Sequence, residues 1–544
     1  MSLWSYTYEA IINRRNRPVA SCHSTLHLSW GLWLVGGLAA AAVLLPILYL
    51  LVRVAGADQG TWALIFQSAT LSTLGRTLGL ALTVSLASAI IALPLAWLTT
   101  RTDLPFSKLW FILGTLPLVI PSYVGAYLMV ASLGPRGMLS QLLNSLLGIS
   151  HLPAIYGFTG AAYVLTLLSY PYTLLSLRAA LQGMDPALEE AARSLGQTRW
   201  RTFWRVTLPQ LRPALAMGSL LIILYVLRDF GAVSIMRYNT FTRVIYLQYS
   251  ATFDRTSAAA LSLVLVSLTV SLLVIEQWLR GRARFYSSAA SARRTPPRIT
   301  LGTWRWPALF FCAGVVTLGL LIPAAVLVHW LVRGLQAGER LLPVWESTGN
   351  SLSASLLAAA ATLVVGIPVA YLSVRYPGRA SRALESLTHT AYALPGIVIA
   401  LALVFFTTNF ALPFYQTLPV LVLAYTILFL SQAASSQRTA LLQVPPGIEE
   451  AARSLGRTPR QVLTSITLPL IRPGLLTGFG LVFLTAMKEL PATLILSPLG
   501  FKTLAVQVWS AVSEAFFAQA AFPALILIVA SSIPMAVLVI QEHR

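Results

Sequence analysis

The sequence predicts an all-α polytopic membrane protein with about twelve transmembrane helices, arranged as two six-helix repeats. Three observations lead to this prediction. Apolar residues make up 57% of the 544 positions and charged residues only 10%, with a mean hydropathy of +0.75, which excludes a soluble globular chain of this length. Apolar stretches long enough to cross a bilayer recur along the chain. The sequence EEAARSLG occurs twice.

The membrane spans are predicted from stretches of roughly 20 apolar residues, the length that crosses about 30 Å of hydrocarbon. The first stretch follows a polar N-terminal segment and is longer than the core of a signal peptide, so we expect it to be retained. The predicted spans are residues 30–53, 73–100, 109–132, 155–181, 214–236 and 258–279, then 306–332, 350–374, 388–408, 417–441, 474–498 and 518–540.

The distribution of Lys and Arg predicts the orientation, because positively charged loops stay in the cytoplasm. Arg14, Arg15 and Arg17 precede the first span, and this orientation places most of the 38 Lys and Arg residues on the inner side. Both termini are therefore predicted to be cytoplasmic. The net charge of +21 is divided among loops rather than gathered on one polar domain, so it favours anchoring at the lipid surface and no nucleic-acid partner.

The two halves of the chain are repeats of one another. EEAARSLGQTRWRTFWRVTLPQLRP aligns without gaps with EEAARSLGRTPRQVLTSITLPLIRP, 260 positions later. Further upstream, ALPLAWLTTR matches GIPVAYLSVR. The aligned segments are residues 189–213 with 449–473, residues 92–101 with 366–375, and Leu116-Pro117 with Leu394-Pro395.

This repeat predicts the domain organisation. Residues 1–280 form an N-terminal six-span unit, residues 281–305 a basic cytoplasmic linker, and residues 306–544 a C-terminal six-span unit. Both units have the same topology, so we expect them to be related by an axis along the membrane normal. A pathway at their interface follows from that symmetry.

A short polar helix is predicted at each copy of EEAARSLG. Asp185 and Pro186 are typical of a helix start, acidic residues follow in the first turn, and Gly196 marks the end. The segment PPGIEEAARSLG has the same form. Each helix is too short to cross a bilayer, while its alanines allow close approach and its charges can fix a register. Docking of a cytoplasmic partner is one interpretation, and residual identity after duplication is the other.

These loops resemble the EAA loop of bacterial binding-protein-dependent ABC importer permeases. In the first copy, Glu190-Ala191-Ala192 is followed by Gly196, Val206 and Leu208-Pro209 at the family's spacing. The second copy has the same spacing; its residues are Glu450, Ala451, Ala452, Gly456, Ile466, Leu468 and Pro469. The resemblance implies the MetI-like type I fold, with EAA loops at residues 185–213 and 445–473.

The same resemblance implies the partners. Each loop would be a coupling helix seated in a separate ATP-binding subunit, so two such subunits would bind the cytoplasmic face of one fused double permease in the bacterial inner membrane. ATP and Mg would be bound by those subunits, and a periplasmic solute-binding protein would deliver the cargo. The chain has no Walker A, GxSxG or Rossmann sequence, so we expect a transport subunit without enzymatic activity or a covalently bound cofactor.

The cargo is predicted from two further segments. Residues 228–246 and 487–509 resemble the ferric-iron permeases of this superfamily, which implies Fe(III) as substrate. Thiamine importers also include fused permeases, and sulphate, molybdate, phosphonate and polyamine systems share the EAA loop. A secondary transporter that needs no ATPase is the alternative from another class. It would require charged relays deep in several spans, whereas this sequence has few membrane charges.

Four charged residues are the candidate pathway residues. Asp229 aligns with Glu489 and Arg228 with Lys488, in the predicted fifth and eleventh spans. Charges at such depth are costly unless they are paired or line a wet cavity. The two carboxylates would suit transient binding of a ferric ion, a hard cation that prefers oxygen ligands. Alternatively, they neutralise Lys488 and Arg228 across the interface. Tyrosines that would add oxygen atoms are Tyr123, Tyr127, Tyr170, Tyr392 and Tyr425.

Overall fold

The computed structural model describes residues 26–541, except 135–136, 149–154, 253, 283–297, 340–343 and 393. The predicted cytoplasmic N-terminus with Arg14, Arg15 and Arg17, most of the predicted linker and the last three residues therefore lie outside the described residues. The described chain is helical apart from turns, loops and one isolated bridge between Thr102 and Ile299. The prediction of an all-α fold is confirmed.

The first half contains five long helices and several short ones. The helices are α2 (Leu26–Ala55), α3 (Gln59–Phe66), α4 (Ser68–Arg101), α5 (Ser107–Thr115), α6 (Ser122–Leu133), α7 (Met138–Leu147), α8 (Phe158–Gly183), α9 (Ala187–Ser194), α10 (Arg199–Thr202), α11 (Leu208–Arg228), α12 (Gly231–Ile235), α13 (Phe241–Ser250) and α14 (Arg255–Arg282). A π-helical turn, Phe203–Thr207, joins α10 to α11.

The described residues of the second half follow a similar order, without equivalents of α3 and α7 and with the equivalent of α11 divided in two. Its helices are α15 (Arg305–Val316), α16 (Ile322–Gln336), α17 (Val344–Arg375), α18 (Arg379–Ala391), α19 (Gly396–Phe410), α20 (Leu418–Gln443), α21 (Pro446–Ser454), α22 (Pro459–Val462), α23 (Leu468–Leu470), α24 (Arg472–Met487), α25 (Pro491–Leu496), α26 (Leu504–Ser513) and α27 (Phe517–Gln541). A second π-helical turn, Leu463–Thr467, lies at the position equivalent to the first.

Each of the twelve predicted apolar segments falls on helices of the structure. Among the described residues, eight helices are long and apolar enough to cross a membrane, or eleven if each bent pair counts as one span. The last predicted span, residues 518–540, coincides with α27. Two kinds of break interrupt the predicted spans. The third and ninth spans bend by 96° and 105°, and the fifth and eleventh helices end at Arg228 and Met487.

Prolines explain the bends and correct one part of the repeat alignment. Pro121 and Pro395 cap α6 and α19 in the same extended conformation, because proline has no N–H to continue a helix. They are 274 positions apart, as are Ala92 and Gly366. The pairing of Leu116-Pro117 with Leu394-Pro395 is therefore wrong by four residues, and Pro117 lies in a 3-10 turn instead. The first half has 14 additional residues between α6 and α8, where α7 lies.

Each half contributes its first membrane helix to the other half. Helix α2 packs against α17, α18 and α19 of the second half as well as α14 of the first, whereas α15 packs against α5, and α16 against α6 and α27. The chain after the linker is fixed to the first half by backbone bonds: Ile299 donates to the Arg101 carbonyl over 2.8 Å and accepts from the Asp103 N–H over 3.1 Å. The two sequence repeats are therefore interlocked as packing units.

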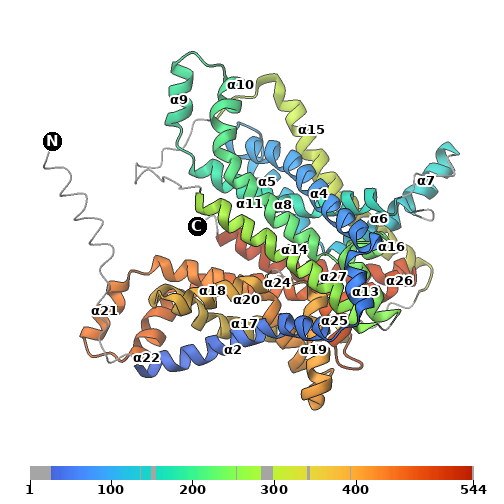
Figure 1. The fold of residues 1–544 in the computed structure, drawn as a ribbon. Helices are drawn as coiled ribbons and strands as arrows, with labels where there is room; N and C mark the ends of the chain where they lie inside the picture. The colour runs from blue at the N-terminus through green and yellow to red at the C-terminus, as the bar shows by residue number, and fades with distance from the viewer. Residues whose placement is uncertain are drawn as a thin grey trace.

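Different sets of helices lie at the two ends of the molecule (Figure 1). Helices α9 and α10 of the first half and α21 and α22 of the second project at one end, whereas α7, α13 and α26 lie at the opposite end. Both copies of the repeated polar helix therefore face the same side of the membrane, as the parallel repeat requires.

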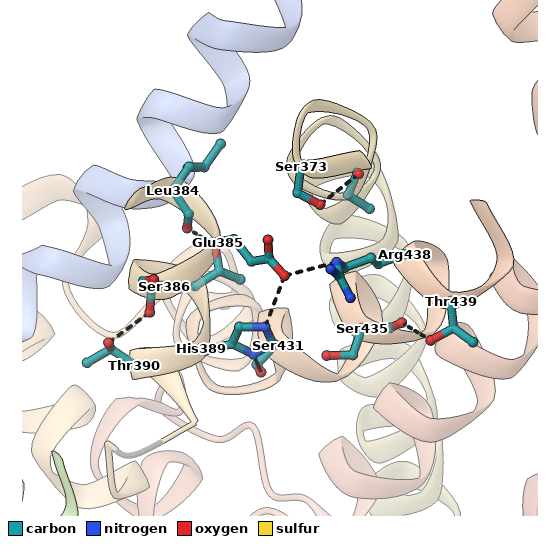
Figure 2. A network of polar contacts seen from close by, with 12 residues as sticks. Ser373, Leu384, Glu385, Ser386, His389, Thr390, Ser431, Ser435, Arg438 and Thr439 are labelled. Atoms are coloured by element: carbon teal, nitrogen blue, oxygen red, sulfur yellow. Dashed lines mark hydrogen bonds and ion pairs between the residues drawn. The ribbon is translucent and has the colours of Figure 1, made fainter. Parts of the chain in front are cut away.

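Helix α18 is fixed to α20 by a polar network (Figure 2). Glu385 lies between Arg438 and His389; its Oε1 is 2.9 Å from Arg438 Nε and 3.8 Å from His389 Nε2. His389 Nδ1 is also 3.1 Å from the Ser431 hydroxyl. The polar face of this amphipathic helix is thereby matched by charge on the long helix beside it.

Candidate translocation and coupling sites

The repeated polar helices have the predicted ends. In α9, the Asp185 side chain accepts from the Ala187 N–H over 2.9 Å. At the C-terminus, Gly196 donates to the Arg193 carbonyl and Gln197 to the Ala192 carbonyl, which is a Schellman motif. Gly196 and Gly456 have φ of +81° and +84°, a conformation that favours glycine. The prediction of a compact helix with a glycine end is confirmed for both copies.

A buried ion pair fixes each of these helices to the end of a membrane helix. Glu189 pairs with Arg101, the last residue of α4, and accepts from the Thr207 hydroxyl over 2.9 Å. We call these three residues the first clamp. The second clamp is equivalent: Glu449 pairs with Arg375, the last residue of α17, and accepts from the Thr467 hydroxyl over 3.0 Å; Arg375 Nε lies 3.1 Å from Glu449 Oε2.

The sequence reasoning missed these residues, although a signal was present. It selected Glu190 and Glu450, which are exposed, as are Ala191 and Ala451; Ala192 and Ala452 are buried. The aligned segments ALPLAWLTTR and GIPVAYLSVR both end in the clamp arginine, and the aligned TLP sequences contain the clamp threonine. Leu195 and Leu455 are 83% and 85% exposed at the helix ends, so each helix has an uncovered apolar side chain.

A cavity of about 170 Å³ lies between the two halves. It is formed where α11 and α24 end and where the third and ninth spans bend, so the four breaks meet at one place. Its polar lining consists of Ser122, Tyr123, Tyr172, Tyr225, Arg228, Asp229, Tyr392, Gln432, Thr485, Lys488 and Glu489. All four charged residues predicted for the pathway are therefore brought together.

The two cations bind backbone carbonyls of the opposite half. Arg228 Nη1 donates to the Tyr392 carbonyl over 3.1 Å, and Lys488 Nζ donates to the Leu118 carbonyl over 3.0 Å. Tyr392 and Leu118 are 274 positions apart and occupy equivalent places before the bends. Both carbonyls lie at helix ends, where the partial negative charge favours a cation. The breaks thus supply the acceptors that each buried cation requires.

The two carboxylates bind N–H groups at the starts of short helices. Asp229 Oδ2 accepts from Ala232 over 3.0 Å and from Val233 over 3.3 Å, at the start of α12. Glu489 Oε1 accepts from Ala492 over 3.3 Å, at the start of α25. In the described part of the chain, neither carboxylate lies within 4.0 Å of Arg228 or Lys488 as an ion pair. The prediction that Asp229 and Glu489 lie within the fifth and eleventh membrane helices is wrong. Both residues follow those helices, because α11 ends at Arg228 and α24 at Met487.

The tyrosines divide into two groups. Tyr123 and Tyr392 line the cavity, as do Tyr172 and Tyr225, which the sequence reasoning did not select. Three of the predicted tyrosines do not line it: Tyr127 donates to the Phe517 carbonyl, Tyr425 lies 2.5 Å from the Thr493 hydroxyl, and Tyr170 packs in an apolar cluster. No group of three or more His, Cys, Asp or Glu side chains in the described ranges is arranged to hold a metal ion.

Sequence comparison identifies the class of protein. The chain belongs to the family of binding-protein-dependent transport system inner membrane components, which matches it twice, at residues 92–285 and 362–544. It is therefore a multi-pass inner-membrane permease in which two permease units are fused, as the repeat predicted.

Individual relatives narrow this class. The chain is 35% identical over 434 residues to the Fe(3+)-transport system permease protein FbpB 2 of Haemophilus influenzae, covering 79% of this chain and 82% of the relative. It is 24% identical over 420 residues to the ferric transport system permease protein FbpB of Actinobacillus pleuropneumoniae, covering 73% and 60%. The molybdenum transport system permease protein ModB of Escherichia coli matches 35% of this chain at 32% identity, over 83% of its own length.

Proposed function

We propose that this chain is the membrane subunit of an ATP-driven importer that carries ferric iron from a periplasmic binding protein into the cytoplasm. The observation that supports it best is the central cavity, to which each half contributes one carboxylate. Ferric ion is a hard cation that prefers oxygen ligands, and Asp229 and Glu489 each have a second oxygen beyond the one that binds backbone N–H groups. The relatives named for Fe(3+) transport support the same cargo.

The clamps supply a mechanism for coupling. Two ATP-binding subunits would hold α9 and α21 through exposed residues such as Glu190, Leu195, Glu450 and Leu455. Since Glu189 and Glu449 tie those helices to the ends of α4 and α17, closure of the ATP-binding subunits would move the membrane helices directly. The halves could then rock about the central cavity, provided that the bonds from Arg228 and Lys488 to opposite carbonyls break and reform.

An oxyanion is the second candidate cargo. It is favoured by Arg228 and Lys488 in the cavity and by the molybdenum permease among the relatives. Both cations already donate to carbonyls, however, whereas Glu489 has an oxygen with no protein donor described and Asp229 takes its further hydrogen bond from the neutral Ser122 hydroxyl. Ferric iron is therefore the stronger proposal.

The test replaces the two carboxylates and measures both cargoes. Asp229→Asn with Glu489→Gln keeps size and removes the negative charge, so iron uptake by the reconstituted complex should collapse while assembly and basal ATP hydrolysis persist. Glu385→Gln, a carboxylate outside the cavity, is the matched control and should retain uptake. Normal iron uptake by the double variant would refute the carboxylate pathway, and uptake of molybdate but not iron by the unaltered complex would refute the cargo.

Removing all four charges tests the structural alternative. If the carboxylates only neutralise the cations, deleting the four charges together is nearly neutral, and the quadruple variant assembles and carries iron. If they contact the ion, it assembles and carries none. The quadruple variant combines the two carboxylate substitutions with Arg228→Gln and Lys488→Gln. The measurement is iron uptake normalised to the amount of assembled complex.

The orientation that we propose places α9 and α21 in the cytoplasm. A single cysteine at Ser194 should react with an impermeant thiol reagent only from the cytoplasmic side, and one at Asn144, an exposed position of α7, only from the periplasmic side. The reverse pattern would exclude docking of an ATP-binding subunit at EEAARSLG.

A further inference from the structure

The first half has an aromatic cluster beside its polar helix that the second half lacks. Trp200, Phe203 and Trp204 pack against one another with ring centroids 5.7–6.1 Å apart, and Phe203 meets Trp97 of α4 edge-on at 5.9 Å. Trp200 is 71% exposed and Trp204 51%. The equivalent positions in the second half are Arg460, Leu463, Thr464 and Tyr371. A feature present at only one of two equivalent loops is not explained by coupling, which both loops share.

These aromatic residues form one wall of a cavity of about 460 Å³. The lining also includes Leu93 and Pro94, which belong to the apolar membrane span Ser68–Arg101. The exposed charged residues of the lining are Arg193, Arg199 and Glu190. The cavity therefore extends from the apolar part of a membrane helix to the polar end of that helix, which is the profile of an amphiphile and not of a soluble ligand.

A buried cation with an unused donor lines this cavity. Arg101 is 3% exposed, and its Nη2 pairs with Glu189 in the first clamp, but its Nη1 is buried without a hydrogen-bond partner. Leaving a charged donor unsatisfied is costly, so an acceptor from outside the chain is expected there. The equivalent Arg375 donates to both oxygens of Glu449 and to the Val444 carbonyl, and no nitrogen of it is buried without a partner.

We propose that this cavity binds an anionic phospholipid of the cytoplasmic leaflet, with its acyl chain against Trp97, Trp200 and Trp204 and a headgroup oxygen that Arg101 Nη1, buried in the structure, turns outward to meet. Tryptophan favours the membrane interface, and basic pockets on the cytoplasmic side bind anionic headgroups. Glu189 and Glu190 also line the cavity, but Glu189 is neutralised by Arg101, and the three arginines leave the lining net positive. The proposal uses the orientation given above and is independent of the cargo.

Such a lipid would act on one coupling loop only. Its headgroup would bind the same guanidinium that ties α9 to α4, so the first clamp would be reinforced by the membrane while the second clamp is complete without it. The inference is that anionic lipid supports coupling through the first half.

The test measures lipid binding by native mass spectrometry of the full-length chain, delipidated and titrated with phosphatidylglycerol or phosphatidylcholine. Phosphatidylglycerol should bind more tightly. Trp200→Ala with Trp204→Ala should weaken its binding about tenfold, since two exposed aromatic contacts are lost without disturbing the core. The matched control, Arg460→Ala with Thr464→Ala, changes the equivalent positions and even removes a positive charge, yet should bind phosphatidylglycerol as the unaltered chain does.

A second pair of variants tests the arginine. Arg101→Lys keeps a cation for Glu189 but removes the free nitrogen, and should weaken phosphatidylglycerol binding about fivefold, whereas Arg375→Lys should not change it. Equal binding by the tryptophan variant and its control would overturn the proposal, as would equal affinity for the two lipids. A photo-crosslinker at position 200 that labels an ATP-binding subunit in the assembled complex, and no lipid, would show that a protein fills the cavity. Because the readout is binding, failure of iron transport leaves this result intact.

Discussion

The two halves place an arginine at the same point and give it different partners. Arg178 of α8 lies over the Phe111 ring, with its Cζ 3.4 Å from the ring centroid, whereas the equivalent Arg438 of α20 forms the ion pair with Glu385. Phe111 and Glu385 are themselves equivalent, 274 positions apart. Phe111 is buried in the apolar cluster that α15 helps to form, whereas Glu385 is on the polar face of α18. A repeat can therefore keep a cation while its partner changes with the local burial.

Other parts of the repeat show no such change. Both clamps contain an arginine, a glutamate and a threonine, and both central cations reach a carbonyl of the opposite half. The differences include the additional helix α7, the 70° bend before α24, the aromatic cluster and the Phe111 site. The elements that would transmit motion and enclose the cargo are kept in pairs, and the elements that differ lie around them.

The largest expected effect on stability is at Phe111, the aromatic partner of Arg178. Phe111→Ala should lower the free energy of unfolding by about 3 kcal/mol, because it leaves a cavity in a closely packed cluster and removes the ring beneath Arg178. The measurement is unfolding of the purified chain in mixed micelles with increasing sodium dodecyl sulphate. Phe310→Ala, which is exposed on α15, is the control and should cost far less. Equal losses would mean that Phe111 does not carry the packing assigned to it.

The sequence could predict the apolar segments and the ends of the polar helices, because these depend on local composition. It also selected Arg228, Asp229, Lys488 and Glu489 through the repeat. It could not predict that α11 ends at Arg228, since the apolar pattern continues through residue 236. Nor could it show that the cations bind carbonyls, because backbone acceptors leave no side-chain pattern.

The clamps show the same limit of prediction from the sequence. Glu189 and Glu190 are adjacent acids in one short helix, and the sequence alone does not say which one is buried. That depends on how α9 is rotated against the end of α4, a tertiary property. The family spacing directed attention to the exposed Glu190, which has no clamp partner. Comparison of two equivalent segments that both end in arginine was the available clue.

The next largest effect distinguishes the two clamps. Glu449→Gln should cost about 2 kcal/mol, because its side chain is 4% exposed and accepts from Arg375 through both oxygens. Glu189→Gln should cost about half as much, since Glu189 is 18% exposed and water replaces part of the lost interaction. Unfolding in mixed micelles and ATP hydrolysis stimulated by the binding protein both report this difference. Equal losses in the two variants would indicate that the clamps are energetically equivalent.

A smaller effect is expected at the glycines that end the polar helices. Gly196→Ala and Gly456→Ala should each cost about 1 kcal/mol, because alanine is strained at a positive φ although no atom lies within 4 Å of the added Cβ. Coupled ATP hydrolysis should fall in the double variant. Gly349→Ala is the control, since that glycine lies inside α17 with open space and no positive φ, where alanine should be neutral or stabilising. Unchanged coupled ATP hydrolysis in the double variant would show that coupling does not depend on the positive φ at these two glycines.

The smallest effect on stability is expected at the ion pair between Arg438 and Glu385, which takes the place of the contact between Arg178 and Phe111. Arg438 and Glu385 are 43% and 25% exposed at their side chains, so Glu385→Ala should lower the free energy of unfolding by about 0.5 kcal/mol. A double-mutant cycle with Arg438→Ala measures the coupling between the two side chains, which should be of the same size. The decisive variant is Glu385→Phe, which gives α18 the residue of the first half. Because α18 is amphipathic and the site is partly exposed, the ring would not be buried as Phe111 is, and no stabilisation should result. A gain of about 1 kcal/mol or more would show that the aromatic partner is intrinsically better and that burial does not decide the choice.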